Sequence, residues 1–132
     1  MIVLDTSAIF AFLNTKDANN RTTTALLATY RGPYVLPLVA LTELAWLIES
    51  RYGPFVFDRF LERVVAGEYQ VDCGTDDLPR IRQLVRKYTD LPLGFADAAI
   101  IACTERLRTS VATYDLRHFP VVAREGTFKI AE

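Results

Sequence analysis

Four acidic residues lie at positions where a carboxylate could take part in catalysis or bind a metal, and need not only be an exposed surface charge. Asp5 directly follows the apolar run of residues 1–4, and Asp115 follows a second apolar segment late in the chain. Glu43 and Asp97 each lie early in a predicted helix, among small or apolar neighbours. Each acid alone has an ordinary interpretation, as a helix cap, an ion-pair partner or a turn residue. Their convergence at one place would be the informative feature.

Carboxylates that share one pocket cannot all remain ionised unaided, because like charges raise one another's pKa. A divalent cation removes this conflict. We expect no Cys or His beside the four acids, and an all-oxygen site suits Mg²⁺ or Mn²⁺ rather than Zn²⁺. Such a site has no nucleophile of its own, so it would activate water and stabilise charge on a phosphoryl group. The hydroxyls that could orient the acids are those of Thr6, Ser7 and Thr113.

An alternation of strands and helices must position these acids. Residues 1–4 are continuously apolar, which is typical of a strand covered on both faces. Further strands are predicted at 34–36, 68–72, 110–113 and within 120–130, and helices at 8–13, 22–30, 37–49, 54–66, 78–88 and 95–107. The alternation predicts one α/β domain over residues 1–132, with a short central parallel sheet of four to five strands and helices on both faces. At the carboxyl edge of such a sheet, where ligands bind, Asp5 and Asp115 are expected to be neighbours.

Glu43 is predicted to project from the buried face of its helix. The residues three and four positions away are Val39, Ala40, Trp46 and Leu47, all of them apolar. A buried carboxylate is costly without a cation or a proton, so this position favours a functional role. A buried Arg partner for the Glu43 carboxylate, or a position of Glu43 along the edge of the helix, would also avoid this cost.

The composition is that of a globular protein, and 132 residues can bury a core without disulfides or a structural metal. The net charge of -1, from 15 Lys+Arg and 16 Asp+Glu, excludes a strongly basic nucleic-acid binder but not a polyanionic substrate. The cations of the helix at 78–88 are interpreted as an exposed face; they are Arg80, Arg82, Arg86 and Lys87.

Cys73 and Cys103 are too few and too isolated for a zinc site or a disulfide framework, so we expect free thiols in a reducing compartment. The longest apolar stretch, residues 35–48, is short for a membrane span and carries Glu43 in its middle. No basic and apolar leader precedes the first strand. These features predict a cytoplasmic protein without a membrane segment.

Four short segments carry a resemblance to a known family. They are the opening MIVLDTSA, Thr42-Glu43-Leu44, LPLGFADA at residues 91–98, and ATYD at 112–115 with RHF at 117–119. In this order and at this chain length, the segments resemble those of the PIN-domain ribonucleases, and among these the VapC-type toxins of toxin–antitoxin pairs. The resemblance covers essentially the whole chain.

The resemblance implies that Asp5, Glu43, Asp97 and Asp115 form an acidic cluster that holds Mg²⁺ or Mn²⁺, with Thr113 as its hydroxyl companion. It implies metal-dependent hydrolysis of RNA phosphodiester bonds by an activated water. It also implies a homodimer, and a cognate antitoxin whose tail can occupy the active site.

Other interpretations are weaker but remain distinguishable. A phosphotransfer receiver domain would need an acidic pair after the first strand and a Lys near Asp115, and a haloacid-type phosphatase would need a second Asp where Ser7 stands. A PIN-like fold kept only for binding a partner would not need all four acids.

Asp90 has no assigned role, and His118, a lone His after a turn, is interpreted as structural or exposed. The apolar helix at 54–66 and the face of Trp46 are the expected dimer surface.

Overall fold

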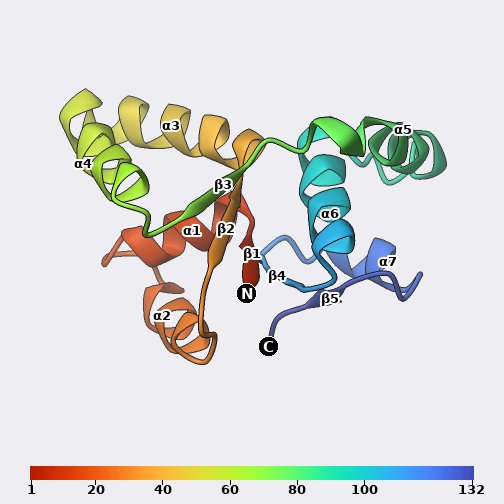
Figure 1. The fold of residues 1–132 in the computed structure, drawn as a ribbon, viewed down its shortest axis with the longest axis horizontal. Coiled ribbons are helices and arrows are strands. Elements are labelled where there is room, and N and C mark those ends of the chain that lie inside the picture. The colour runs from red at the N-terminus through yellow and green to blue at the C-terminus, as the bar shows by residue number, and fades with distance from the viewer.

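The computed structural model, which describes residues 1–132, has five parallel strands in one central sheet (Figure 1). The order across the sheet is β3-β2-β1-β4-β5. In the register of the two middle strands, Leu4 of β1 pairs with Ala112 of β4. The residues that follow these two strands are therefore neighbours at the carboxyl edge, as the sequence predicted. The strands are β1 (Ile2–Leu4), β2 (Tyr34–Pro37), β3 (Gln70–Asp72), β4 (Ser110–Ala112) and β5 (Lys129–Ile130).

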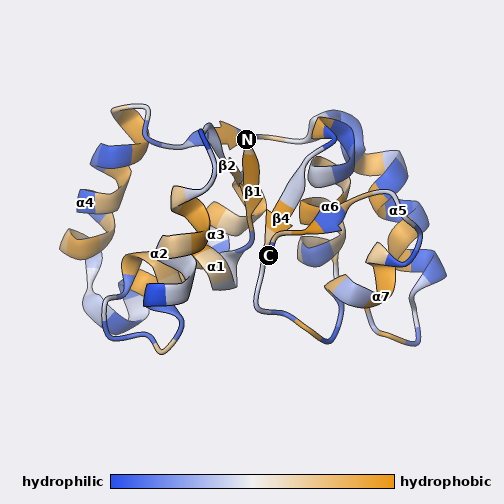
Figure 2. Cartoon of the chain, turned by 90° about the horizontal axis from the view of Figure 1, so that it is seen from below, coloured by the Kyte–Doolittle hydropathy of each residue, from blue (hydrophilic) through white to orange (hydrophobic).

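Helices cover both faces of this sheet. In Figures 1 and 2, α1 to α4 lie on one side of the strands and α5 to α7 lie on the other. None of the helices is both long enough and apolar enough to cross a membrane. The helices are α1 (Thr6–Leu13), α2 (Asn20–Ala28), α3 (Leu38–Tyr52), α4 (Pro54–Val65), the 3-10 turn η1 (Thr75–Asp77), α5 (Leu78–Lys87), α6 (Phe95–Leu107) and α7 (Phe119–Ala123).

The hydrophobic core is one cluster of 26 buried residues centred on β1, whose three residues are all fully buried. Figure 2 shows β1 in the colour of hydrophobic residues. Helix α6 packs across β1, β2 and β4, and its buried Ala98 and Ala102 allow a close approach to the sheet. Each fully buried Val, Leu or Ile of this core contributes about 1.5–3 kcal/mol to folding. The core thus fixes the start of α6 against the ends of β1 and β4.

Two local predictions differ from the structure. Pro37 has an extended backbone, with φ -58° and ψ 140°, and closes β2 instead of opening the next helix. The strand predicted within 120–130 is present as β5, but it is preceded by α7, a helix that was not predicted. The helix forms because Phe119 and Val122, three residues apart, are both fully buried on one face. Cys73 and Cys103 are free, as expected.

Candidate active site

Asp5 lies at the junction of β1 and α1 and is only 5% exposed. Asp5 is the N-cap residue of α1, but its side chain makes no capping hydrogen bond, so the helix does not occupy its carboxylate. Instead, its Oδ2 accepts hydrogen bonds from the hydroxyls of Ser7, at 2.8 Å, and Thr113, at 2.7 Å. Burial raises the pKa of Asp5, although these hydrogen bonds oppose the shift. The strand end thus delivers a buried carboxylate held by two hydroxyls.

The two hydroxyls also connect α1 to the end of β4. The backbone N–H of Tyr114 donates to Ser7 Oγ at 2.9 Å, and the N–H of Asp115 donates to Thr113 Oγ1 at 3.0 Å. Ser7 and Thr113 therefore hold Asp5 and Asp115 in fixed relation, as the sequence suggested for hydroxyls of this site. Residues more than 100 positions apart meet here because β1 and β4 pair directly.

Asp97 lies in the first turn of α6 and is partly buried. Its pKa is raised from 3.8 to about 6, first by burial and then by the negative charges of Asp5 and Asp115, with a further contribution from Glu43. The charge of His118 opposes this shift. The negative charges of the other three acids thus all contribute to the raised pKa of Asp97.

Asp115 closes a tight turn at the end of β4. Its Oδ1 accepts the backbone N–H groups of Arg117 and His118, both at 3.0 Å, and its Oδ2 lies 2.8 Å from Nδ1 of the His118 ring. Although burial acts in the opposite direction, the hydrogen bonds from His118 and Arg117 hold the pKa of Asp115 below its usual range. Asp115 therefore remains ionised more readily than Asp5 and Asp97, whose pKa values are raised.

Glu43 does not lie on the buried face of α3, so that prediction is wrong. The buried face is formed by Ala40, Leu44 and Ile48, which repeat every four residues, and Glu43 stands one position away from this stripe. Its carboxylate is exposed and accepts a hydrogen bond from Thr6 Oγ1 at 2.8 Å. Glu43 thus reaches the acidic group from the solvent side, tethered to the start of α1.

His118 was not predicted to belong to the site. Its ring is only partly buried, and Nδ1 lies 3.8 Å from Asp97 Oδ2 as well as 2.8 Å from Asp115. One ligand atom from each of Asp97, Asp115 and His118 lies within 4.8 Å of the others, so the expectation of a site without His is wrong. The spacing of three residues between Asp115 and His118 was the available signal. Asp90, by contrast, is exposed on the loop between α5 and α6.

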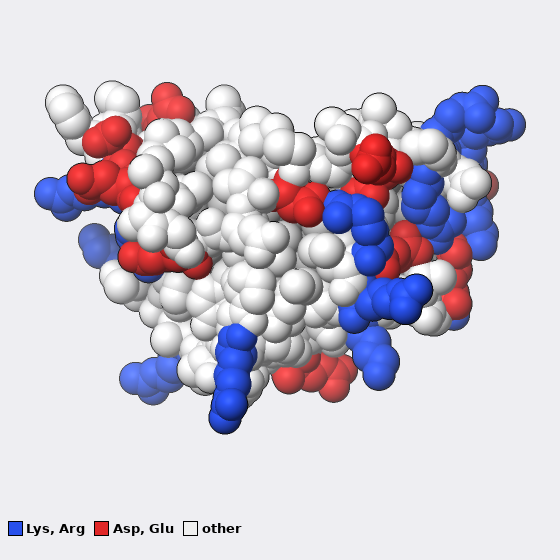
Figure 3. Space-filling model, viewed as in Figure 1, with Lys and Arg blue, Asp and Glu red and all other residues white.

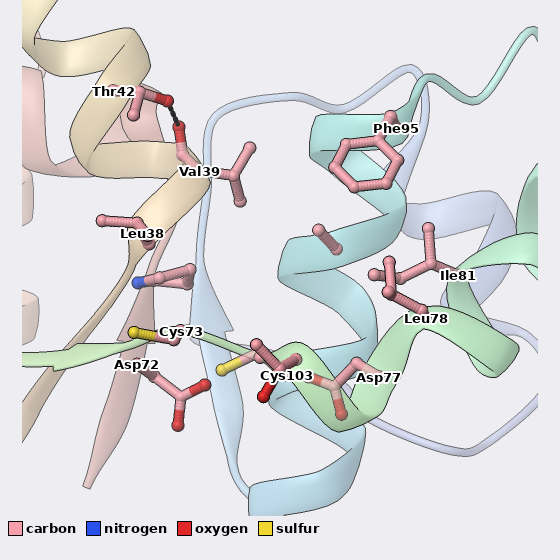
Figure 4. Close-up of a pocket in the computed structure, with 14 residues that line it drawn as sticks. Leu38, Val39, Thr42, Asp72, Cys73, Asp77, Leu78, Ile81, Phe95 and Cys103 are labelled. Carbon is pink, nitrogen blue, oxygen red and sulfur yellow. Dashed lines mark hydrogen bonds between the residues drawn. The ribbon is translucent and has the colours of Figure 1, made fainter.

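A cavity of about 460 Å³ lies beside this acidic group and is not lined by any of the four acids. Figure 4 shows its walls, which come from the start of α3, the segment from the end of β3 to the first turn of α5, and α6. Thr42 precedes Glu43 and Phe95 lies two residues before Asp97, so the cavity belongs to the same edge of the protein. Its lining is largely apolar and includes Leu38, Leu78 and Phe95, all substantially exposed.

Lys and Arg side chains gather on the side formed by α5 to α7, while the middle of the same face is largely uncharged (Figure 3). Part of the positive charge of α5 is neutralised within the protein. Arg80 pairs with Glu105 and Glu125, and Lys87 also pairs with Glu125. Arg82 and Arg86 are exposed, in agreement with the predicted solvated face.

The donor set fits a hard divalent cation. Carboxylate oxygens are the preferred ligands of Mg²⁺ and Mn²⁺. Burial raises the pKa of Asp97 most, and the negative charges of Asp5 and Asp115 raise it further. A cation at this point would be held by carboxylates from β1, α3, α6 and the turn after β4.

Fold and site together define a parallel α/β protein with a carboxylate centre at the carboxyl edge of its sheet. The model of the PIN domain family matches residues 2–125, and the chain belongs to that family.

The chain is similar over nearly its full length to proteins of known name. It is 27% identical over 127 residues to Ribonuclease VapC26 of Mycobacterium tuberculosis, which covers 95% of this chain and 94% of that protein. The solved structure of M. tuberculosis VapC20, described as a sarcin-ricin loop cleaving toxin, superposes with a TM-score of 0.81 at 19% identity, covering 92% of this chain and 95% of that one. A toxin-antitoxin complex from Klebsiella pneumoniae gives a TM-score of 0.69 at 17% identity, covering 91% and 93% of the two chains.

Proposed function

We propose that this protein is an endoribonuclease that hydrolyses RNA phosphodiester bonds with the help of Mg²⁺ or Mn²⁺ and acts as the toxin of a toxin–antitoxin pair. The observation that carries the proposal is the gathering of acids at the carboxyl edge of the sheet: ligand atoms of Asp97 and Asp115 lie within 4.8 Å of one another, and the Thr113 hydroxyl connects Asp115 to the buried Asp5. Membership of the PIN domain family supports it. The name of the VapC26 relative supports ribonuclease activity, and the VapC20 and Klebsiella neighbours support a toxin with an antitoxin partner.

In this proposal the four acids hold the cation, which would acidify a bound water and neutralise charge on the phosphoryl group. The chain itself supplies preorganisation. Ser7 and Thr113 fix the carboxylate of Asp5, and the backbone N–H groups of the turn fix that of Asp115. Because these groups are already oriented in the folded protein, little reorganisation is needed when charge develops during hydrolysis.

We further propose that the protein acts in the cytoplasm, on RNA, and that its protein partners are a cognate antitoxin and a second copy of the chain. The dimer surface is proposed on α4 and the adjoining face of α3. Trp46 is 70% exposed, Phe55 85% and Val65 87%, which is unusual for large apolar side chains in a monomer. We expect Phe55→Lys to shift the protein towards monomer in size-exclusion chromatography with light scattering. The control Gln83→Lys, at an exposed position of α5 outside this surface, should remain dimeric. A dimer unaffected by Phe55→Lys would contradict this placement.

Cleavage of a mixed RNA pool by the purified protein, free of antitoxin, tests the function. Activity should require Mg²⁺ or Mn²⁺, disappear with a chelator, and fall by at least about 100-fold in Asp97→Asn, since a carboxylate of the centre is lost. Asp58→Asn, which removes the same charge from an exposed surface of α4, should cleave like the wild type. Equal cleavage by Asp97→Asn would point to a contaminating nuclease or to a misplaced site. No cleavage by a folded and metal-loaded protein would favour a very narrow RNA target or the alternative of a PIN fold that only binds a partner.

A further inference from the structure

In the turn from Asp115 to His118, the two oxygens of the Asp115 carboxylate have different hydrogen-bond partners. Oδ1 accepts both backbone N–H groups of the turn, those of Arg117 and His118. Oδ2 is contacted by the ring of His118 through Nδ1 at 2.8 Å. One oxygen thus closes the turn, and the other is engaged by a side chain.

The turn does not depend on the ring for its shape. Its backbone hydrogen bonds are complete on Oδ1, and the next residue, Phe119, is fully buried and anchors the start of α7. The ring instead faces the acidic group, with Nδ1 3.8 Å from Asp97 Oδ2. Its contact is therefore with the oxygen of Asp115 on the side of Asp97.

We propose that His118 is a positioning residue of the cation site, acting through Asp115. The terminal torsion of an Asp side chain is broad, so a carboxylate held at one oxygen can swing about its last bond. The Nδ1–H···Oδ2 hydrogen bond gives Asp115 a second point of attachment and fixes Oδ2 within reach of Asp97. Two carboxylates whose oxygens are held close together bind one cation without first having to be ordered. This inference rests on the proposed function, because it assumes that the acids hold a divalent cation.

The chain offers an unusually clean test, since His118 is its only histidine. Mn²⁺ serves as the probe, and its affinity is measured by calorimetry on the whole protein without RNA. His118→Ala removes the donor, and His118→Asn keeps an N–H donor close to the position of Nδ1. Leu116→Ala is the control, because Leu116 lies on the same turn with an exposed side chain.

We expect His118→Ala to weaken Mn²⁺ binding by about 10-fold or more, the usual effect of removing a group that orients a ligand. His118→Asn should recover most of the affinity, and Leu116→Ala should match the wild type. Thermal unfolding in the presence of chelator should be similar for all variants, which separates a lost orientation from a lost fold.

Three results would overturn the inference. The first is wild-type affinity in His118→Ala, and the second is no recovery in His118→Asn although it is folded. The third is a directly coordinated imidazole nitrogen in the pulsed EPR spectrum of bound Mn²⁺, which would make His118 a ligand. Failure of the wild-type protein itself to bind Mn²⁺ would overturn the proposed cation site along with this inference, whereas the first three results leave that site intact.

Discussion

Replacing Thr113 by Val removes a hydroxyl from the centre of the site while keeping the shape of the side chain. Two hydrogen bonds disappear with it, the one donated to Asp5 at 2.7 Å and the one accepted from the N–H of Asp115 at 3.0 Å. Asp5 is almost completely buried and keeps only the Ser7 hydroxyl as a side-chain donor. We therefore expect a loss of stability larger than that of an ordinary Thr-to-Val change.

The magnitude follows from the type of each bond. A hydrogen bond to a charged group contributes about 1.5–3 kcal/mol, and leaving a partly buried N–H without its acceptor costs about 1 kcal/mol more. The free energy of unfolding should fall by about 2–4 kcal/mol at pH 7. Thr104→Val is the matched control: Thr104 is fully buried, but its hydroxyl donates to the neutral carbonyl of Ile100, so the loss should be about 0.5–1.5 kcal/mol.

The assay is urea unfolding of both variants in the presence of chelator, at pH 7 and near pH 3. Because the pKa of folded Asp5 lies above its ordinary value of 3.8, ionised Asp5 lowers stability above that pH, and the Thr113 hydroxyl reduces this cost. The deficit of Thr113→Val relative to the wild type should therefore shrink as the pH falls from 7 through the raised pKa of Asp5, and should be smallest below 3.8. A deficit no larger than that of Thr104→Val at pH 7, or one that does not change with pH, would refute the reasoning.

Two further predictions concern stability away from the site. A hydrogen bond from Tyr88, followed by those from Lys87 and Arg80, lowers the pKa of Glu125 from 4.5 to about 2, so its stabilising contribution is present above pH 4.5 and lost as the pH falls towards 2. In urea unfolding at pH 7, Glu125→Gln should lower the free energy of unfolding by about 1–3 kcal/mol and weaken the loss of stability at acidic pH. An unchanged loss of stability at acidic pH would contradict this prediction. Gly74→Ala should lower the free energy of unfolding by about 1–3 kcal/mol, because Gly74 has a φ of +65° and an added Cβ would meet Asp77 Oδ2 at 3.1 Å. Gly67→Ala, at a φ of +90° with open space around it, should lower it less when both variants are compared by thermal unfolding. The reverse order would be inconsistent with the steric argument.

Much of the fold could be predicted because its signals are local. The apolar run that became β1, the regular alternation of strands and helices, and the helix around Asp97 are written in contiguous residues. Pairing of the first and fourth strands also followed from general rules for parallel sheets. The helix α7 was missed because its five residues, rich in Pro and Val, resemble a strand as closely as a helix.

Glu43 shows where local reasoning failed within the site. Its apolar neighbours on the helix suggested a buried carboxylate, yet Trp46 is itself exposed, and the buried stripe of α3 runs through Leu44. Helical spacing identifies residues that share a face, but not which face meets the core when both carry apolar side chains. That choice is made by the packing of α3 against α1, α4 and α6.

The sequence by itself determined the residue types of the site, the strand ends that carry Asp5 and Asp115, and the family. Only the tertiary structure decided the exact contacts: Thr113 with Asp5 across 108 positions, Thr6 with Glu43 across 37, and His118 with Asp97. The physical reason is that a strand or helix is specified by neighbouring residues, whereas a hydrogen bond between distant side chains depends on how several packed elements come together. His118 therefore resembled a surface residue in the sequence and lies beside two acids in the folded protein.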